Sequence, residues 1–293
     1  MNESRLNILY RGSLSSCNYG CSYCPFALKR NSAAELAKDR AELERFVHRI
    51  VAERVFGERP LGIFFTPWGE ALTRDYYHAS ILELAESETI VRIAVQTNLS
   101  ANLNWLQKAR REKIALWASY HPDQVSRERF LGRCRELDEL GVRYSVGMVG
   151  LKENLDEIEA MRAALDERVY LWVNAYKREE NYYSDSMLMR IRSIDSLFDY
   201  NLTNHQSLGR ACKAGESVVS IDGEGTIRRC HFIQDKLGNL YDEEPLRFLR
   251  RRPCTNDVCR CHIGYVHLEK TNLYPVFGEG LLERIPAVIP PRN

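Results

Sequence analysis

The sequence predicts an α/β protein, a partial (β/α)6 barrel with parallel strands followed by a small cysteine-rich α+β extension. Short apolar runs alternate with longer amphipathic segments, as in strands joined by helical crossovers. Six such units are fewer than the eight of a closed barrel. After residue 200 the alternation stops, and five of the nine cysteines follow. We therefore expect residues 1–199 to form the barrel and residues 200–293 the extension.

Six segments carry the β-branched and aromatic residues of half-buried strands. They are Leu6–Leu14, Leu61–Thr66, Ile90–Thr97, Ile114–Ser119, Arg143–Val149 and Val169–Asn174. In a parallel sheet of this kind, functional groups gather at the carboxyl ends of the strands and in the loops that follow. Polar residues after these strands are therefore candidate site residues.

Helices are expected between the strands. Ala33–Phe56 is preceded by Ser32 and carries Glu35, which together fit a capping box. Val125–Leu140 ends before Gly141, a common helix stop. The other helical candidates are Leu155–Leu165 and Ser184–Phe198.

The extension begins with a polar linker and then a predicted hairpin. Ser217–Ile221 and Thr226–Cys230 are the two strands, and the turn between them contains two glycines. A short helix is expected around Pro245–Arg250. The last part, Tyr265–Pro286, either lines the barrel mouth or packs against the barrel.

Composition restricts the class of protein. The 293 residues are 44% hydrophobic and 28% charged, typical of a soluble globular chain. A net charge of +1 gives no electrostatic reason to expect a nucleic-acid partner. No run approaches the roughly 18 apolar residues of a membrane span, and the N-terminus lacks a signal-peptide pattern. We expect a cytoplasmic protein with neither nucleic acid nor membrane as partner, whose odd number of cysteines serves metal ligation rather than disulfides.

Three cysteines follow the first strand directly. Cys17, Cys21 and Cys24 form a C-x-x-x-C-x-x-C pattern, with Asn18 and Gly20 supplying turn-forming residues. Thiolates suit iron–sulfur clusters or zinc. A four-iron cube normally takes four cysteines, so three leave one iron open for chemistry. Structural zinc is the alternative, although it requires a fourth ligand.

This spacing, its place after the first strand, and Tyr23 before the third cysteine resemble the radical S-adenosylmethionine (radical SAM) superfamily over residues 6–198. The resemblance implies a [4Fe–4S] cluster at the barrel mouth, whose open iron chelates the amino and carboxylate groups of S-adenosyl-L-methionine. It implies reductive cleavage of that cofactor to a 5′-deoxyadenosyl radical, with electrons from a donor such as flavodoxin or ferredoxin. The radical chemistry belongs to the cofactor, and the protein binds and orients it.

Three further positions extend the resemblance. Thr66-Pro67-Trp68-Gly69-Glu70 is similar to the Gly-Gly-Glu segment of the family, which implies that Gly69 and Glu70 receive the methionyl amino group. Trp68 replaces the first glycine of that segment. The family also places Thr or Ser near the cofactor at strand ends, which implies that role for Thr97 and Ser119. A simple turn and ordinary helix capping are the alternatives.

A second group of cysteines lies in the extension. Cys212 and Cys230 flank the hairpin in a C-x12-G-x4-C pattern that resembles the start of SPASM and twitch extensions. This implies an auxiliary [4Fe–4S] cluster. Cys254, Cys259 and Cys261 follow, with His262 as a further possible ligand. Five cysteines suffice for one four-thiolate cluster, and which four ligate is open; structural zinc is the alternative.

The leading functional hypothesis is radical modification of a peptide or protein, because SPASM-like extensions often accompany such substrates. The alternatives are a radical enzyme for a small molecule or cofactor precursor, and a non-catalytic metal-binding or redox-sensing module. No catalytic acid or base is identified. Cys134, on a predicted helix, is expected to be a buried, inert thiol.

Overall fold

The protein is described by a computed structural model covering residues 5–24, 29–245 and 247–289. One mixed sheet runs through it in the order β11-β10-β9-β1-β2-β3-β4-β5-β6. The first six strands are parallel and adjacent in sequence order, which confirms the predicted α/β partial barrel. They are β1 (Leu6–Arg11), β2 (Leu61–Phe65), β3 (Ile90–Thr97), β4 (Ile114–Ser119), β5 (Arg143–Gly150) and β6 (Leu171–Ala175).

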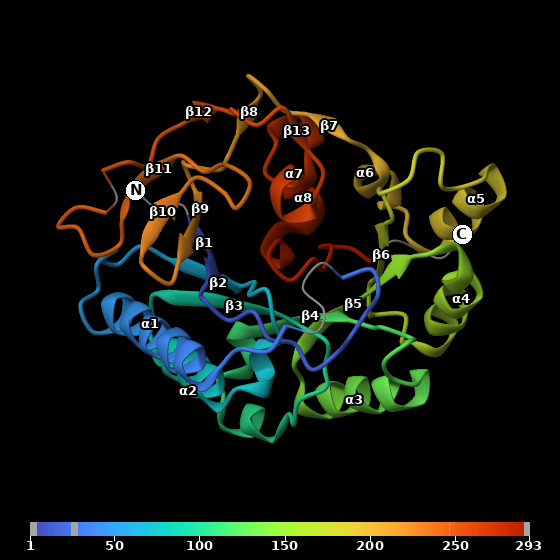
Figure 1. Cartoon of the computed structure of the whole chain (residues 1–293), viewed down its shortest axis with the longest axis horizontal. Coiled ribbons are helices and arrows are strands. Elements are labelled where there is room, and N and C mark those ends of the chain that lie inside the picture. Colours follow the sequence, from blue (N-terminus) through green and yellow to red (C-terminus); the bar gives the residue numbers. More distant parts are fainter. Residues whose placement is uncertain (1–4, 25–28, 246, 290–293) are drawn as a thin grey trace.

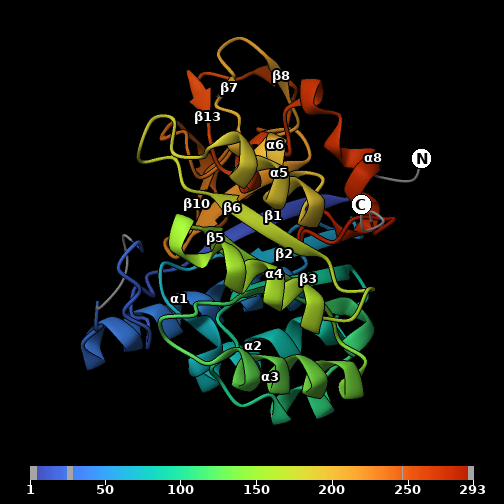
Figure 2. The same ribbon diagram turned by 90° about the vertical axis from the view of Figure 1, so that its right-hand side faces the viewer.

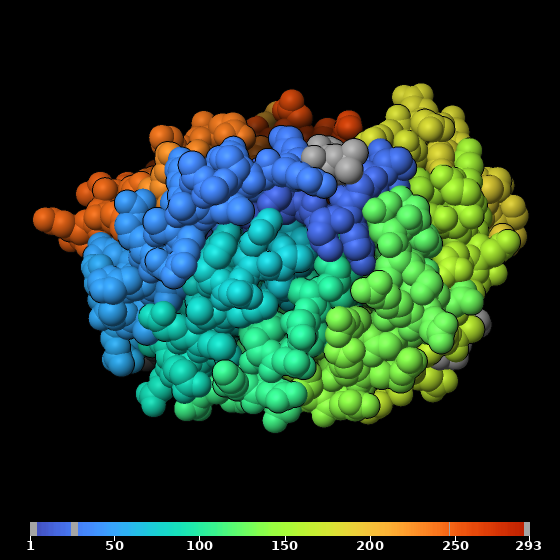
Figure 3. Space-filling model, turned by 60° about the horizontal axis from the view of Figure 1, so that its bottom comes forward, coloured from blue at the N-terminus to red at the C-terminus, as the bar shows by residue number. Residues whose placement is uncertain are grey.

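Helices cover the outer face of the sheet (Figure 1). They are α1 (Ala33–Val51), α2 (Asp75–Glu86), α3 (Arg127–Leu140) and α4 (Leu155–Ala164), with α5 (Asp185–Ile194) and α6 (Phe198–Leu202) after β6. Figure 3 shows this face, where blue, teal and green segments dominate and the orange extension appears along the top and the upper left. The Ser32–Glu35 capping box forms as predicted, and Gly141 ends α3 with a φ of 66°. None of the helices in the described ranges is long and apolar enough to cross a membrane.

The connection between β3 and β4 departs from the expected strand–helix pattern. It contains only the short 3-10 turns Asn104–Lys108 and Arg111–Lys113. Asn98 Oδ1 accepts from the Ser100 N–H, and Asn102 Oδ1 accepts from the Asn104 N–H. Such side-chain-to-backbone bonds compete with helix formation, so the prediction of a full helix in this unit was wrong.

The hairpin of the extension joins the barrel sheet. β9 (Val218–Asp222) pairs in parallel with β1, and β10 (Thr226–Arg228) pairs antiparallel with β9. β11 (Lys236–Asn239) completes this edge. The extension therefore continues the sheet of the barrel. The prediction of a helix around Pro245–Arg250 was wrong. The described residues of this stretch, which exclude Leu246, form turns, and the Arg250 N–H donates to the Gly215 carbonyl.

The rest of the extension packs on the inner face of the sheet, opposite the helices (Figure 2). It contains the strand pairs β7 (His205–Gln206) with β13 (Val258–Cys259), and β8 (Ala211–Cys212) with β12 (Arg252–Pro253), followed by α7 (His262–Tyr265) and α8 (Leu273–Phe277). Inward side chains of the strands, such as Phe64 and Trp117, share one apolar core with Phe277 and Leu281. The tail thus packs against the barrel and fills much of its inside.

A buried carboxylate holds the tail in this place. Glu283 is fully buried and lies 3.5 Å from Arg92 and 3.2 Å from Arg143, at the beginnings of β3 and β5. The Ser145 hydroxyl donates to the Glu283 carbonyl at 2.7 Å. These contacts connect the C-terminal segment to the amino ends of two central strands.

Replacing Glu283 with alanine should therefore destabilise the protein by about 3 kcal/mol, because two arginines lose their buried partner. Urea denaturation followed by circular dichroism measures this loss. Glu279→Ala is the matched control: its carboxylate pairs with Arg5 on the surface, so its loss should cost at most about 1 kcal/mol. Equal stability of the two variants would contradict the assignment.

Candidate active site

The three N-terminal cysteines lie on the irregular loop that leaves the carboxyl end of β1. The Cys24 N–H donates to the Cys21 carbonyl at 3.0 Å. The Tyr19 N–H and the Asn98 side chain approach Cys17 Sγ at 3.5 and 3.8 Å. Burial raises the pKa of Cys17 and raises that of Cys21 to about 12. Metal binding would therefore be coupled to release of thiol protons.

Side chains from distant elements fix this loop on both sides of the cysteines. Asn31 Oδ1 accepts from the Ser15 and Ser16 N–H groups at 2.9 and 2.8 Å. Beyond Cys17, the Gly20 N–H donates to Gln124 Oε1 at 2.8 Å. Arg178, after β6, donates to the Tyr23 carbonyl at 2.7 Å. Residues 15–23 are thus held in place by both ends of the half-barrel.

Tyr23 forms a close pair with His121, a residue that sequence reasoning missed. The Tyr23 hydroxyl lies 2.6 Å from His121 Nδ1, and the two rings stack with centroids 5.9 Å apart. Burial lowers the pKa of His121 to about 4, so the imidazole is neutral near pH 7 and its Nδ1 can accept a hydrogen bond from the Tyr23 hydroxyl. Its position two residues after β4 was the available signal.

The segment after β2 packs directly on the cysteine loop. A Cβ on Gly69 would lie 2.0 Å from the Ser16 carbonyl oxygen, so only glycine fits. The Glu70 N–H donates to that same oxygen at 3.0 Å. Trp68 is 41% exposed, and the Arg11 guanidinium stacks 4.2 Å from its ring centroid. Gly69 therefore lies against the backbone next to Cys17.

Glu70 and Thr97, both predicted site residues, belong to one buried network. Glu70 Oε1 accepts from the Thr97 hydroxyl at 2.7 Å and from the Leu72 N–H at 3.2 Å. Its Oε2 accepts from the Asn98 N–H at 2.6 Å. Burial raises the pKa of Glu70 to about 7 despite these donors. The carboxylate therefore joins the ends of β2 and β3 and keeps about one acceptor position unused.

A central cavity of about 400 Å³ opens next to the cysteine loop. Tyr23, Cys24 and Ser119 line it from the barrel side, and Cys261 and Arg284 line it from the extension. Its volume falls within the range of small-molecule sites. The structure thus brings predicted residues from both halves of the chain to one enclosed space.

Four of the five C-terminal cysteines line a second, smaller cavity. Cys212, Cys230, Cys254 and Cys259 are each at most 7% exposed and surround it, together with apolar side chains. No three His, Cys, Asp or Glu side chains in the described ranges are close enough to hold a single metal ion. A single zinc needs all its ligands around one point, whereas the thiolates of a four-iron cube bind different irons. The four thiols therefore surround the cavity without converging on one point in the described structure.

Cys261 lies apart from these four. It is absent from the lining of the second cavity and instead lines the central cavity beside His262. Desolvation of the thiol raises its pKa, and a hydrogen bond from the Ile263 backbone and the charges of Arg284 and Lys177 oppose the shift. The sequence left open which four cysteines ligate; in the structure Cys261 is the one that does not line the second cavity.

Comparison with known structures finds proteins whose fold is similar to that of this chain. A structure of native anSMEcpe with bound AdoMet and Cp18Cys peptide matches 83% of this chain and 79% of that chain, with 14% identity and a TM-score of 0.54. Native anSMEcpe with bound AdoMet matches 82% of this chain and 79% of that chain, with 15% identity and the same TM-score. anSME is a radical SAM enzyme of the SPASM type. The chain has the radical SAM fold.

BtrN in complex with AdoMet and 2-DOIA matches 81% of this chain and 79% of that chain, with 16% identity and a TM-score of 0.40. No family model and no curated protein sequence matches the chain.

Replacing Gly69 with alanine should displace the cysteine loop, because the new Cβ would collide with the Ser16 backbone. We expect reduced iron and sulfide content after anaerobic reconstitution, measured by chemical analysis per chain. Gly132→Ala is the control, since its nearest heavy atom is 3.7 Å away on a flexible arginine. Full iron and sulfide in Gly69→Ala would show that the contact is not required.

The second cavity gives a prediction for each C-terminal cysteine. In a background lacking Cys17, Cys21 and Cys24, the protein should retain about four irons and four sulfides. Adding Cys261→Ser should leave this content unchanged, whereas serine at any of the four cavity cysteines should lower it. Stoichiometric zinc without sulfide would contradict the cluster, and loss of iron in Cys261→Ser would contradict the ligand set.

Proposed function

We propose that this protein is a radical SAM enzyme that binds a [4Fe–4S] cluster through Cys17, Cys21 and Cys24 and cleaves S-adenosyl-L-methionine to a 5′-deoxyadenosyl radical. The main supporting observation is the position of the cysteine loop. It lies at the mouth of the central cavity, in a fold shared with an AdoMet-bound enzyme. A one-electron donor of the flavodoxin or ferredoxin class, in the cytoplasm, belongs to this proposal.

When bound, the cluster and S-adenosyl-L-methionine supply the radical chemistry. The chain's own residues bind and shield them. Gly69 and Glu70 keep the cysteine loop against the ends of β2 and β3, and Tyr23, Thr97 and Ser119 are the proposed cofactor contacts. The extension covers the inner face of the sheet and excludes water from the reacting space. Exclusion of water protects a reactive intermediate from side reactions.

The four cysteines of the second cavity are proposed to hold an auxiliary [4Fe–4S] cluster. Their burial among apolar side chains separates them from solvent. A non-catalytic metal-binding module is less consistent with the molecule, because such a module needs no cavity between its two cysteine groups.

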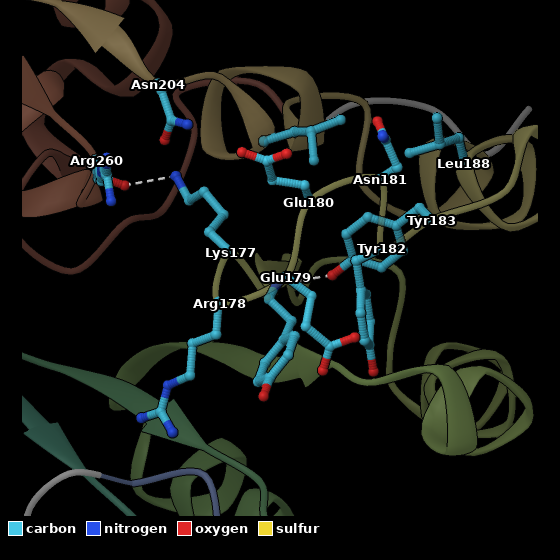
Figure 4. A pocket seen from close by; sticks show the side chains of 12 residues that line it. Lys177, Arg178, Glu179, Glu180, Asn181, Tyr182, Tyr183, Leu188, Asn204 and Arg260 are labelled. Carbon is cyan, nitrogen blue, oxygen red and sulfur yellow. Dashed lines mark hydrogen bonds between the residues drawn. The ribbon is translucent and has the colours of Figure 1, made fainter.

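The proposed substrate is a peptide or a protein segment. A further pocket of about 590 Å³, distinct from the two cavities described above, lies beside the central cavity (Figure 4). It is built from the chain after β6, including Glu179, Asn181 and Tyr182, and from Asn204 and Arg260 of the extension. It shares the lining residues 176–178 with the central cavity. The two spaces adjoin along this shared wall, which suits an extended chain. The fold neighbour with bound Cp18Cys peptide supports the same substrate class.

The primary test is cofactor cleavage by the reconstituted, reduced protein. Alanine at Cys17, Cys21 or Cys24 should abolish 5′-deoxyadenosine formation, because each variant loses one of the three ligands. Cys134→Ala is the matched control: this thiol is buried on α3, and its loss should leave cleavage intact. Chromatographic detection of 5′-deoxyadenosine from any of the three loop variants would sink the proposal.

A further inference from the structure

Arg284 extends from the C-terminal tail into the central cavity. It is only 2% exposed and is among the largest fully buried side chains. Its guanidinium lies 4.5 Å from the ring centroid of Trp172 and 5.6 Å from that of Trp117. Within the described ranges, no acceptor reaches its Nε and no carboxylate lies within ion-pair distance. Buried charges are normally paired, so this cation requires an explanation.

The backbone at this point is strained. Arg284 has a φ of 56°, in the left-handed region that arginine rarely adopts. The preceding Glu283 is committed to Arg92 and Arg143 on the other side of the tail, so it is not the partner of Arg284. Strain of this kind persists where the surrounding structure enforces it, commonly at ligand sites.

The other cations of the cavity are already engaged. Lys177 Nζ donates to the carbonyls of Asn201 and, at 2.6 Å, of Arg260. Arg178 donates to the Tyr23 carbonyl. No aspartate or glutamate is among the described residues that line the cavity. The space therefore carries excess positive charge, and Arg284 supplies the donors that remain available.

One carboxylate, that of Asp195, attracts Arg284 from outside the cavity. Its oxygens already accept from the Tyr170 hydroxyl at 2.5 Å and from the N–H groups of Val173 and Leu197 at 2.9 and 3.0 Å. It is fully buried and does not line the cavity. Asp195 thus offsets part of the charge without supplying the hydrogen bonds that a guanidinium fork can make.

Two more polar atoms beside Arg284 lack partners. His262 Nε2 and Trp117 Nε1 are buried and unpaired within the described part of the chain, and both residues line the cavity. Each lies on a side chain that is at most 5% exposed. Unpaired buried polar atoms are costly, and three around one space indicate a missing polar ligand.

We propose that Arg284, with His262 and Trp117, binds a carboxylate of the substrate. A planar guanidinium suits bidentate binding of a carboxylate. This inference rests on the proposed function and specifies its substrate: an acidic group held by the tail residue Arg284 in the central cavity. The carboxylate belongs either to an acidic side chain or to a free chain terminus.

Calorimetric titration of the anaerobically reconstituted protein with S-adenosyl-L-methionine present tests this. N-acetyl-L-glutamate N-methylamide carries a side-chain carboxylate, N-acetyl-L-glutamine a terminal one, and N-acetyl-L-glutamine N-methylamide neither. We expect one of the acids to bind, which identifies the source, and the neutral probe to bind at least about tenfold more weakly. Arg284→Met should weaken binding of that acid roughly 10- to 100-fold.

Arg54→Met is the matched control, because Arg54 also has a left-handed φ, of 46°, but pairs with Glu58 on the surface. It should not change binding. If Arg284→Met fails to fold, Arg284→Lys keeps the charge without the fork and should still weaken binding. Equal binding of acidic and neutral probes, or undiminished binding by the Arg284 variants, overturns the inference.

A third result would also overturn it. If Arg284→Met loses affinity for S-adenosyl-L-methionine to the same extent, in a separate titration with that cofactor alone, the cation belongs to the cofactor site. Failure of the proposed function can be distinguished from failure of this inference. If the unsubstituted protein forms no 5′-deoxyadenosine, that function is wrong, while the carboxylate binding measured by calorimetry stands or falls by itself.

Discussion

The close contact between Gly69 and the Ser16 backbone is the constraint on which the cysteine loop depends. It allows the turn after β2 to lie directly on the residue before Cys17. The next residue, Glu70, binds the end of β3 through Thr97 and Asn98, and Asn98 in turn reaches Cys17. The carboxyl ends of β1, β2 and β3 are thereby joined in one hydrogen-bond network. Burial of the carboxylate is costly, as its raised pKa indicates, and the donors around it offset that cost.

The inner face of the sheet imposes the second constraint. An open half-barrel would expose large apolar side chains, and the extension buries them. Gly147 leaves room for the Trp172 ring, which would lie within 2.1 Å of a Cβ there. That ring then supports Arg284. The same packing that stabilises the fold therefore shapes the floor of the central cavity, and the Glu283 contacts determine where the tail enters.

Local sequence patterns predicted most of the barrel and the positions of its cysteines. Ile90–Thr97 and Ile114–Ser119 begin and end as predicted, because alternation and turn residues mark both ends. The predicted helix between them does not form, because the side chains of Asn98 and Asn102 accept hydrogen bonds from nearby backbone N–H groups. Hydrophobic periodicity does not reveal such bonds. The pairing of β9 with β1 joins residues more than 200 positions apart, and no local pattern encodes it. Arg284 was missed for the same reason, because its contacts with Trp117 and Trp172 are tertiary. His121 was missed although it follows the end of β4 by two residues.

The separation of Cys261 from the other cysteines follows from the short helix α7. Cys259 ends β13 and faces the second cavity, where Gly264 leaves room for its sulfur: a Cβ there would lie 2.6 Å from Sγ. Cys261 precedes the helix, and it and His262 line the central cavity instead. One turn of helix thus forms the wall between the two spaces. Since both faces of this turn are occupied by functional groups, a shift of α7 that enlarges one cavity must displace the lining of the other.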